Sequence, residues 1–238
     1  SWRSQECAHD RKKAVSSSLS ELHRLIDKVD PIDANNERKS SYWDAVLARC
    51  QSHPSEVITQ DHRGRTCLLS ACAKNPPVIV VETMLERCRV GTDALRDKTG
   101  FTAMTIAIRN HASLKVVRLL AQRSSLLTTA DHQGNTPLHL ACQDLYKRNT
   151  TELVAVLLDA CPCLAERENS TGKTPLHAAI ESKAPLDIVR ILVQASPESV
   201  VNNTCGRTPL VYAIQNVALQ TCRILIQANP KVTRIRDE

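Results

Sequence analysis

Short apolar runs at helical spacing recur along the chain, and turn-forming residues separate them. In one such stretch, Leu176, Ala179 and Ile180 form an apolar face, and a second apolar run begins at Leu186. The pattern predicts two short helices, of which the first is capped at its N-terminus by Thr174. Neither helix is long enough to be stable alone in water. Each must therefore bury its apolar face against a neighbouring unit.

The helix pair lies in a phrase that the chain repeats with small changes. The clearest copies read GNTPLHLA at 134–141 and GKTPLHAA at 172–179, and a weaker copy reads GRTPLVYA at 206–213. Two degraded copies, GRTCLLSA at 64–71 and GFTAMTIA at 100–107, lack both Pro and His, so we expect their helices to start less sharply. Neighbouring copies lie 34 to 38 residues apart. A period of this length predicts a stacked solenoid.

The phrase resembles the T-P-L-H-x-A signature of ankyrin repeats, which recur about every 33 residues. The resemblance extends from about Ser41 to Val232. It implies an all-α solenoid of helix–turn–helix units, in which His139 and His177 belong to a hydrogen-bond network with the turn and the neighbouring repeat. Where such repeats usually close with Gly-Ala-Asp, this chain has Cys161-Pro162, Ser196-Pro197 and Asn229-Pro230.

The copies predict about five repeats, which start near residues 61, 97, 131, 169 and 203. Upstream of them, Trp43, Val46 and Leu47 lie on one side of a predicted helix over 42–50. We interpret this helix as a degenerate cap repeat over about 41–60. The solenoid is therefore expected to carry an N-terminal helical cap.

A second amphipathic helix is predicted over about 18–29, opened by a capping box of Ser18 and Glu21. We expect it to pack on the cap, and the alternative is a detached helix that binds a partner. The predicted organisation is a polar segment over 1–40, a repeat domain over 41–233 and a tail over 234–238.

The composition suits thin aliphatic layers, because hydrophobic residues make up 42% of the chain and aromatic residues only 3%. The net charge of +6 is spread along the chain, so it allows an acidic partner without indicating nucleic acid. No apolar stretch approaches the roughly 18 residues of a membrane span, and no secretory signal is visible. The sequence predicts a cytoplasmic location, with the nucleus as the alternative.

Ten cysteines are present, and their positions favour buried thiols over disulfides. Cys72 and Cys142 each follow the Ala that closes the phrase, on the predicted inner helix. Buried free Cys behaves as a small hydrophobe and fits a reducing compartment. Cys161 and Cys163 are the one close pair, whereas a zinc site needs four ligands. We therefore expect no metal and no cofactor.

Motifs of catalysis are missing from the sequence. No Gly-rich phosphate loop occurs, and neither H-E-x-x-H nor G-x-S-x-G is present. A solenoid of thin layers also offers no obvious deep pocket in which to desolvate a nucleophile. The sequence therefore predicts that the protein is not an enzyme.

The predicted binding surface is the concave side of the solenoid, which the turn tips and inner helices line. Several tip residues are Arg or Lys, whereas Asp61, Asp97 and Asp131 occupy the position that caps the turn. Phe101, the one phenylalanine of the chain, falls at a tip, and the third copy carries an insertion around Tyr146 that predicts a loop. The candidate partner-binding residues are Arg63, Arg65, Lys98, Phe101, His132, Asn135, Tyr146, Arg148, Lys173 and Arg207.

These observations favour a scaffold or adaptor that binds another protein, for example through an acidic segment. One alternative is a regulatory segment of a larger multidomain enzyme or transcription factor. A nucleic-acid-binding module is a weaker alternative, because no aromatic–basic platform accompanies the charge. Residues 231–238 are too short to cover the apolar face of the last repeat, so that repeat could also support a homodimer.

Overall fold

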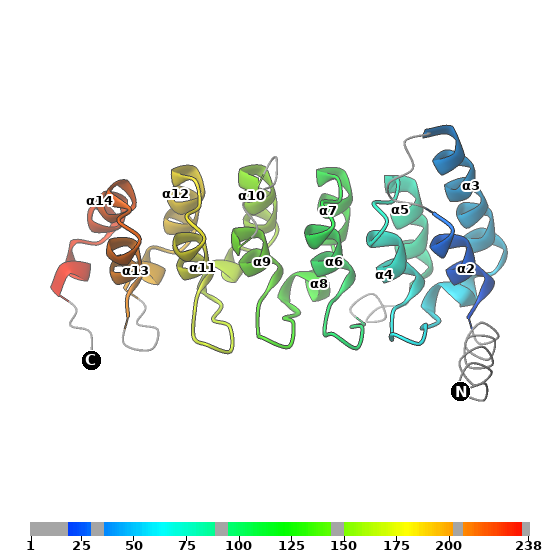
Figure 1. The fold of residues 1–238 in the computed structure, drawn as a ribbon, viewed down its shortest axis with the longest axis horizontal. Coiled ribbons are helices and arrows are strands. Elements are labelled where there is room, and N and C mark those ends of the chain that lie inside the picture. Colours follow the sequence, from blue (N-terminus) through cyan, green and yellow to red (C-terminus); the bar gives the residue numbers. More distant parts are fainter. Residues whose placement is uncertain (1–18, 30–35, 89–94, 144–149, 202–206, 235–238) are drawn as a thin grey trace, which may run out of the picture.

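The computed structural model describes residues 19–29, 36–88, 95–143, 150–201 and 207–234, which form a row of helix pairs (Figure 1). The inner helices are α2 (Glu21–Asp27), α4 (Cys67–Cys72), α6 (Ala103–Arg109), α9 (Pro137–Gln143), α11 (Pro175–Glu181) and α13 (Pro209–Gln215). The outer helices are α3 (Asn36–Ser52), α5 (Val78–Arg87), α7 (Leu114–Ala121), α10 (Thr150–Ala160), α12 (Leu186–Ala195) and α14 (Leu219–Ala228). The short helices that follow outer helices are η1 (Pro54–Ile58), α8 (Ser124–Thr128), η2 (Pro162–Glu166), η3 (Pro197–Val200) and η4 (Pro230–Arg234).

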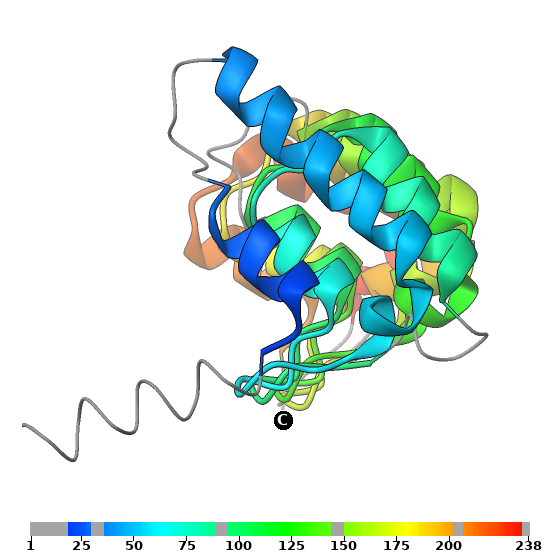
Figure 2. The same ribbon diagram turned by 90° about the vertical axis from the view of Figure 1, so that its right-hand side faces the viewer.

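The helix pairs stack in chain order into a solenoid, which confirms the fold class predicted from the sequence. Figure 2 looks along the stack and shows the inner helices behind one another, the outer helices behind one another, and the turns gathered along one edge. Each inner helix contacts the next inner helix, as α9 contacts α11, and each outer helix contacts the next outer helix, as α10 contacts α12.

One aliphatic side chain of each phrase forms the centre of its layer. The Leu of T-P-L-H-x-A is buried in α9 and α11 as Leu138 and Leu176, and Met104 takes its place in α6. The outer helices contribute β-branched residues, such as Val116 and Ile188, which are fully buried between layers. Each such side chain stabilises the fold by roughly 1.5–3 kcal/mol. The core is therefore spread along the stack rather than gathered at one centre.

The inner helices start at N-caps in the degraded copies as well as in the clear ones. Thr174 and His177 form a reciprocal capping box at α11. In α6 the same box is made by Thr102 and Thr105, and in α4 the Thr66 side chain accepts the N–H of Leu69. The expectation that these two helices start less sharply is therefore wrong, because a Thr hydroxyl is sufficient to cap them without Pro or His.

Four of the inner helices, α4, α6, α11 and α13, are followed by a residue of left-handed conformation. Asn75, His111 and Lys183 have φ between 52° and 59° at this position, and Val217 has φ 55°. Asn and His tolerate this region, whereas a β-branched residue there is an outlier. Of these four connections, the one after α13 therefore has the residue least suited to its backbone conformation, Val217.

The N-terminal helices differ from the prediction. The cap of α2 is Ser20, whose Oγ accepts the N–H of His23, so the capping box predicted at Ser18 is wrong. The next helix, α3, begins at Asn36, and it therefore runs through the predicted boundary between residues 40 and 41. The physical reason is that α2 and α3 pack as an inner and an outer helix, with Leu22 and Trp43 buried in their layer.

Four of the eight cysteines that the structure describes are buried free thiols, in line with the prediction for Cys72 and Cys142. Cys72 and Cys142 have no exposed surface and lie in the core. Cys161 and Cys163 differ, because the structure joins them in a disulfide across Pro162. Their Cα atoms are 5.4 Å apart, a separation that a disulfide can bridge.

Candidate binding surface

Each turn between repeats is held from the inside by its acidic or amide residue. The Oδ1 atom of Asp61 accepts the N–H groups of Arg63 and Arg65, both at 2.8 Å. Asp97, Asp131 and Asn169 accept two N–H groups each in the same way, at 2.8 to 3.0 Å. The acidic residues of the turns are therefore used by the backbone, as predicted.

Asp97 illustrates how completely the turn uses its carboxylate. Its side chain is buried, which alone would raise its pKa, but hydrogen bonds from Thr99, Phe101 and Arg65 outweigh burial and lower the pKa. The carboxylate therefore stays charged inside the turn. Its charge is directed to backbone and neighbouring groups rather than to the surface.

Two pairs of neighbouring turns are joined by backbone hydrogen bonds. The N–H of Lys98 donates to the carbonyl of Arg63, and the N–H of Ser170 donates to the carbonyl of Gln133, both at 2.9 Å. The described turns lie in a row along one edge of the solenoid (Figure 1).

The exposed side chains on this row are polar, and those that carry a charge at neutral pH are Arg and Lys. Arg63, Lys98, His132 and Arg207 are exposed, and Lys173 is half-buried. We call these five residues the tip surface. Asp61, Asp97 and Asp131 accept backbone N–H groups of their own turns, so no acidic side chain occupies a tip position beside these residues.

Three candidate residues lie differently from their predicted exposed positions. Asn135 is 2% exposed, because it accepts a hydrogen bond from Asn169 in the next turn (2.9 Å). Arg65 forms an ion pair with the buried Asp97 (3.2 Å). Phe101 is half-buried, with a guanidinium 4.7 Å from its ring centre. Arg65 and Asn135 are therefore parts of the framework, because groups of the neighbouring turn hold their side chains.

Tyr146 and Arg148, predicted on the inserted loop, lie outside the described residues.

The phrase histidines connect each inner helix to the next turn. His139 Nδ1 lies 2.9 Å from Thr136 Oγ1, and its Nε2 lies 2.8 Å from the carbonyl oxygen of Lys173 in the next repeat. His23 makes the same two contacts, with Ser20 Oγ (2.9 Å) and the carbonyl oxygen of Arg65 (3.0 Å). The structural role that the resemblance implies for His139 is thus confirmed, and it recurs in α2.

The sequence analysis missed a cluster on the inner helices beside the tip surface. Lys173 Nζ lies 2.7 Å from Glu181 Oε2 and 5.5 Å from the ring centre of Tyr212. The Tyr212 ring also packs edge-on against the ring of His177 at 5.5 Å. Tyr212 occupies a position that differs between copies of the phrase, so a comparison of the copies beyond the turn would have indicated Tyr212 as a candidate binding residue. The sequence analysis also missed Arg109, which covers the Phe101 ring.

The described residues do not indicate a site of chemistry. Burial raises the pKa of Cys72 and of Cys142 to about 12, which keeps both thiols protonated and unreactive. No group of His, Cys, Asp and Glu that could hold a metal ion is found in the described ranges. Among the helices that the structure describes, none has the length and apolar character needed to cross a membrane.

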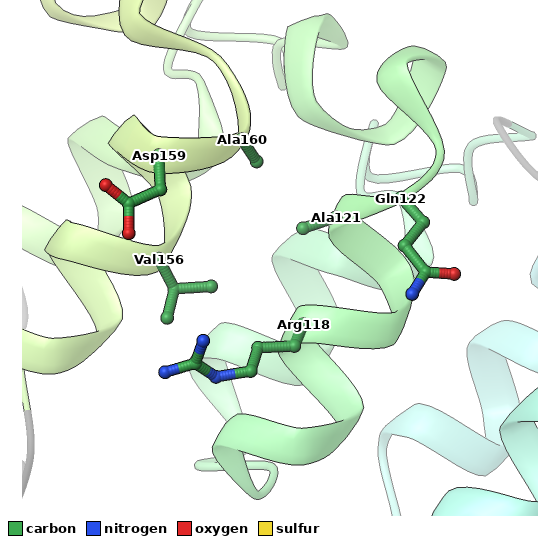
Figure 3. A pocket seen from close by; sticks show the side chains of 6 residues that line it. All are labelled: Arg118, Ala121, Gln122, Val156, Asp159 and Ala160. Atoms are coloured by element: carbon green, nitrogen blue, oxygen red, sulfur yellow. The ribbon is translucent and has the colours of Figure 1, made fainter.

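A hollow of about 500 Å³ lies on the opposite side, between outer helices α7 and α10. Figure 3 shows Arg118 extending from α7 toward α10, near Val156 and Asp159. The hollow arises because Ala121 stands where α5 and α12 have the larger Leu85 and Val193. Its lining residues are Arg118, Ala121, Gln122, Val156, Asp159 and Ala160.

The stacked helix pairs, the joined turns and the exposed row define a repeat protein of the solenoid class. The sequence profile described as "Ankyrin repeats (3 copies)" matches residues 69–164, 122–201 and 145–236, which together exceed half of the chain. The chain therefore belongs to the ankyrin repeat family. Repeats of this family typically serve as modules for binding other proteins.

Several curated proteins are similar to this chain over a small part of their own length. B-cell lymphoma 3 protein of Homo sapiens is 33% identical over 106 residues, which are 44% of this chain and 23% of that protein. Rabankyrin-5 of Mus musculus is 29% identical over 141 residues (59% and 12%). SMC5-SMC6 complex localization factor protein 1 of Homo sapiens is 26% identical over 173 residues (72% and 15%). This chain thus spans a quarter or less of these relatives.

Among solved structures, the fold resembles a chain in the complex of the Bd0816 predatory endopeptidase from Bdellovibrio bacteriovorus with immunity protein Bd3460. The TM-score is 0.65 at 20% identity, covering 88% of this chain and 99% of that one. At this identity the similarity establishes the fold only.

Proposed function

We propose that this protein is a non-enzymatic binding module that captures an acidic segment of another protein on its tip surface. The observation that carries the proposal is the separation of charges in the turns. Arg63, Lys98 and Arg207 are exposed, while Asp61 and Asp97 are engaged with backbone N–H groups. An acidic segment would therefore meet positive potential along the row, which speeds association and selects the partner.

The inner helices would add specificity beside this row. Tyr212 and Phe101 present half-buried rings with Lys173 and Arg109 placed over them. Aromatic and Arg side chains are frequent energetic centres of interfaces. A partner with an apolar residue next to its carboxylates would contact both features. If the chain is part of a larger enzyme or transcription factor, the repeats would regulate that protein by binding a partner through the same surface.

A cytoplasmic or nuclear location is part of the proposal. The free thiols of Cys50, Cys67, Cys72 and Cys142 support it, since thiols persist in reducing compartments, whereas the Cys161–Cys163 disulfide is a feature of oxidising ones.

Reversing charge on the tip surface is expected to weaken binding of an acidic peptide. In fluorescence anisotropy with a labelled oligo-aspartate peptide, the double variant Arg63→Glu/Lys98→Glu should raise Kd at least about tenfold. The matched control is Lys115→Glu/Arg118→Glu, which makes the same charge change on exposed residues of α7. It should bind with nearly the wild-type affinity.

Equal effects of the two double variants would refute the site, because they would show a response to net charge only. Tighter binding of a single-stranded oligonucleotide than of the peptide, with a steep salt dependence, would favour the nucleic-acid alternative.

A further inference from the structure

The disulfide between Cys161 and Cys163 encloses a single residue, Pro162, at the start of η2. Cys163 is exposed and Cys161 is half-buried. Among the cysteines that the structure describes, Cys163 is the one exposed residue. The bridge is therefore within reach of thiols in solution, and exposed disulfides are typically the labile, regulatory or catalytic ones.

The backbone around the bridge has the same conformation in repeats that have no bridge. Cys161 has φ −154° and ψ 93°, while its equivalents Ser196 and Asn229 have φ −145° and −147° with ψ 89° and 97°. The N–H of each of these three residues donates to the carbonyl of the residue four positions earlier, at 3.0 to 3.1 Å. The outer helix and the proline that follows it are thus sufficient to set this conformation. The bridge can then open and close without a change of fold.

The position of Cys163 has no packing role in the other repeats. The equivalent residues are likewise exposed and differ in chemistry: Ser55 in η1, Glu198 in η3 and Lys231 in η4. A disulfide that closes so short a loop also constrains the unfolded chain little, because this contribution grows with loop length. Neither packing nor chain entropy therefore accounts for a pair of cysteines at this place.

The buried cysteines are protected from thiol chemistry. Burial raises the pKa of Cys67 to about 12 and that of Cys50 to about 11. Exchange with a disulfide needs an accessible thiolate, and neither residue offers one at neutral pH. Free thiols and a disulfide thus occur in one protein, although reducing compartments favour the former and oxidising compartments the latter. Where disulfides occur in reducing compartments, they are usually transient and serve catalysis or redox sensing.

We propose that Cys161-Pro162-Cys163 is a redox-active site that undergoes reversible thiol–disulfide exchange with glutathione. A glutathione thiolate attacks the exposed sulfur of Cys163, the bond between the two protein sulfurs breaks, and Cys161 leaves as a thiolate. A second glutathione thiolate attacks the glutathione sulfur of this mixed disulfide and releases Cys163 as a thiolate.

The exchange balances in electrons and protons. The two protein thiolates take up the protons that the two glutathione thiols lost. The protein thus gains two electrons and two protons, while two glutathione molecules become one glutathione disulfide. The reverse sequence consumes glutathione disulfide and closes the bridge.

Mass spectrometry of the full 238-residue chain tests the proposal. The protein is equilibrated at neutral pH with glutathione buffers that range from fully reduced to fully oxidised, quenched with acid, alkylated and digested. The peptide that contains Cys161 and Cys163 should carry two alkyl groups in reduced buffers and an intact bridge in oxidised buffers, and each form should convert to the other. In Cys161→Ser, which removes the leaving sulfur, oxidised buffers should leave glutathione attached to Cys163.

The matched control is Cys161→Ser/Cys163→Glu, which gives η2 the residues that η3 has at the equivalent positions. This variant should keep the helical circular dichroism of the wild type. A bridge that survives fully reduced glutathione, or a control variant that loses its helical signal, would overturn the proposal because the bridge would be structural. A pair that stays reduced in glutathione disulfide would overturn it as well.

The redox site goes beyond the proposed capture of an acidic segment and does not depend on it. The Arg63→Glu/Lys98→Glu variant should show the same conversion in glutathione buffers as the wild type. A failure of peptide binding at the tip surface is therefore distinguishable from a failure of thiol–disulfide exchange.

Discussion

Replacing Gly134 with alanine is expected to lower the free energy of unfolding by about 3 kcal/mol. Gly134 has φ +76°, and an added Cβ would lie 2.5 Å from the backbone N and 2.8 Å from the Oγ of Ser170. The backbone of Ser170 cannot move aside without cost, because its N–H donates to the carbonyl of Gln133. Urea unfolding followed by circular dichroism would measure the change.

Gly64→Ala is the matched control for this prediction. Gly64 has nearly the same φ, +75°, but an added Cβ would meet nothing closer than 3.4 Å. Gly64→Ala should therefore lower the free energy of unfolding by about 1 kcal/mol only, which is the cost of placing alanine in the left-handed conformation. If the two variants lose the same stability, the close approach of neighbouring turns does not contribute and the argument from packing is wrong.

Acidification from about pH 6.5 to about pH 4 is expected to destabilise the fold through the phrase histidines. Burial lowers the pKa of His177 from 6.5 to about 4, although the nearby backbone of Arg207 opposes the shift. Burial lowers the pKa of His139 as well. The unfolded chain takes up protons near pH 6.5, whereas the folded chain does not. Stability is therefore complete above that pH and is lost progressively toward pH 4.

The contribution of His177 to this loss is on the order of 3 kcal/mol, at about 1.4 kcal/mol for each pKa unit. Urea midpoints measured over this pH range at constant ionic strength would give the slope for the wild type and for His177→Gln. The variant should show a shallower slope, because Gln takes up no proton. An identical slope in both proteins would contradict the assignment of His177 as a buried neutral group.

The fold was predictable from the sequence because each phrase contains its own start and turn signals. The helices of the Gly172 copy begin and end where Thr174, Pro175 and Ser196-Pro197 place them. The N-terminal repeat was not predicted because its phrase is reduced to Ser20-Glu21-Leu22-His23, in which Ser and Glu replace Thr and Pro. Its histidine nevertheless makes the same contacts as His139, so the S-x-L-H pattern was the available signal.

The candidate site was predictable only as far as local sequence determines it. The inward role of Asp61, Asp97 and Asp131 follows from the turn itself, and the structure confirms it. The positions of Arg65 and Asn135 depend on the next turn, which lies 32 and 34 residues away in the chain. Whether a turn residue is exposed or buried is decided by what stacks on it. That information is distributed over two repeats, so one phrase cannot supply it.

The inward turn of the Asp and Asn side chains has a consequence for how such a protein can evolve. Each loop keeps its shape through one side chain, a glycine and backbone hydrogen bonds. The exposed neighbours, such as Arg63, Lys98 and Arg207, are therefore free to change without altering the loop. Binding specificity can therefore change by single substitutions at the turn tips while the fold is retained. Each repeat adds exposed positions to the surface that can be substituted independently of the other repeats.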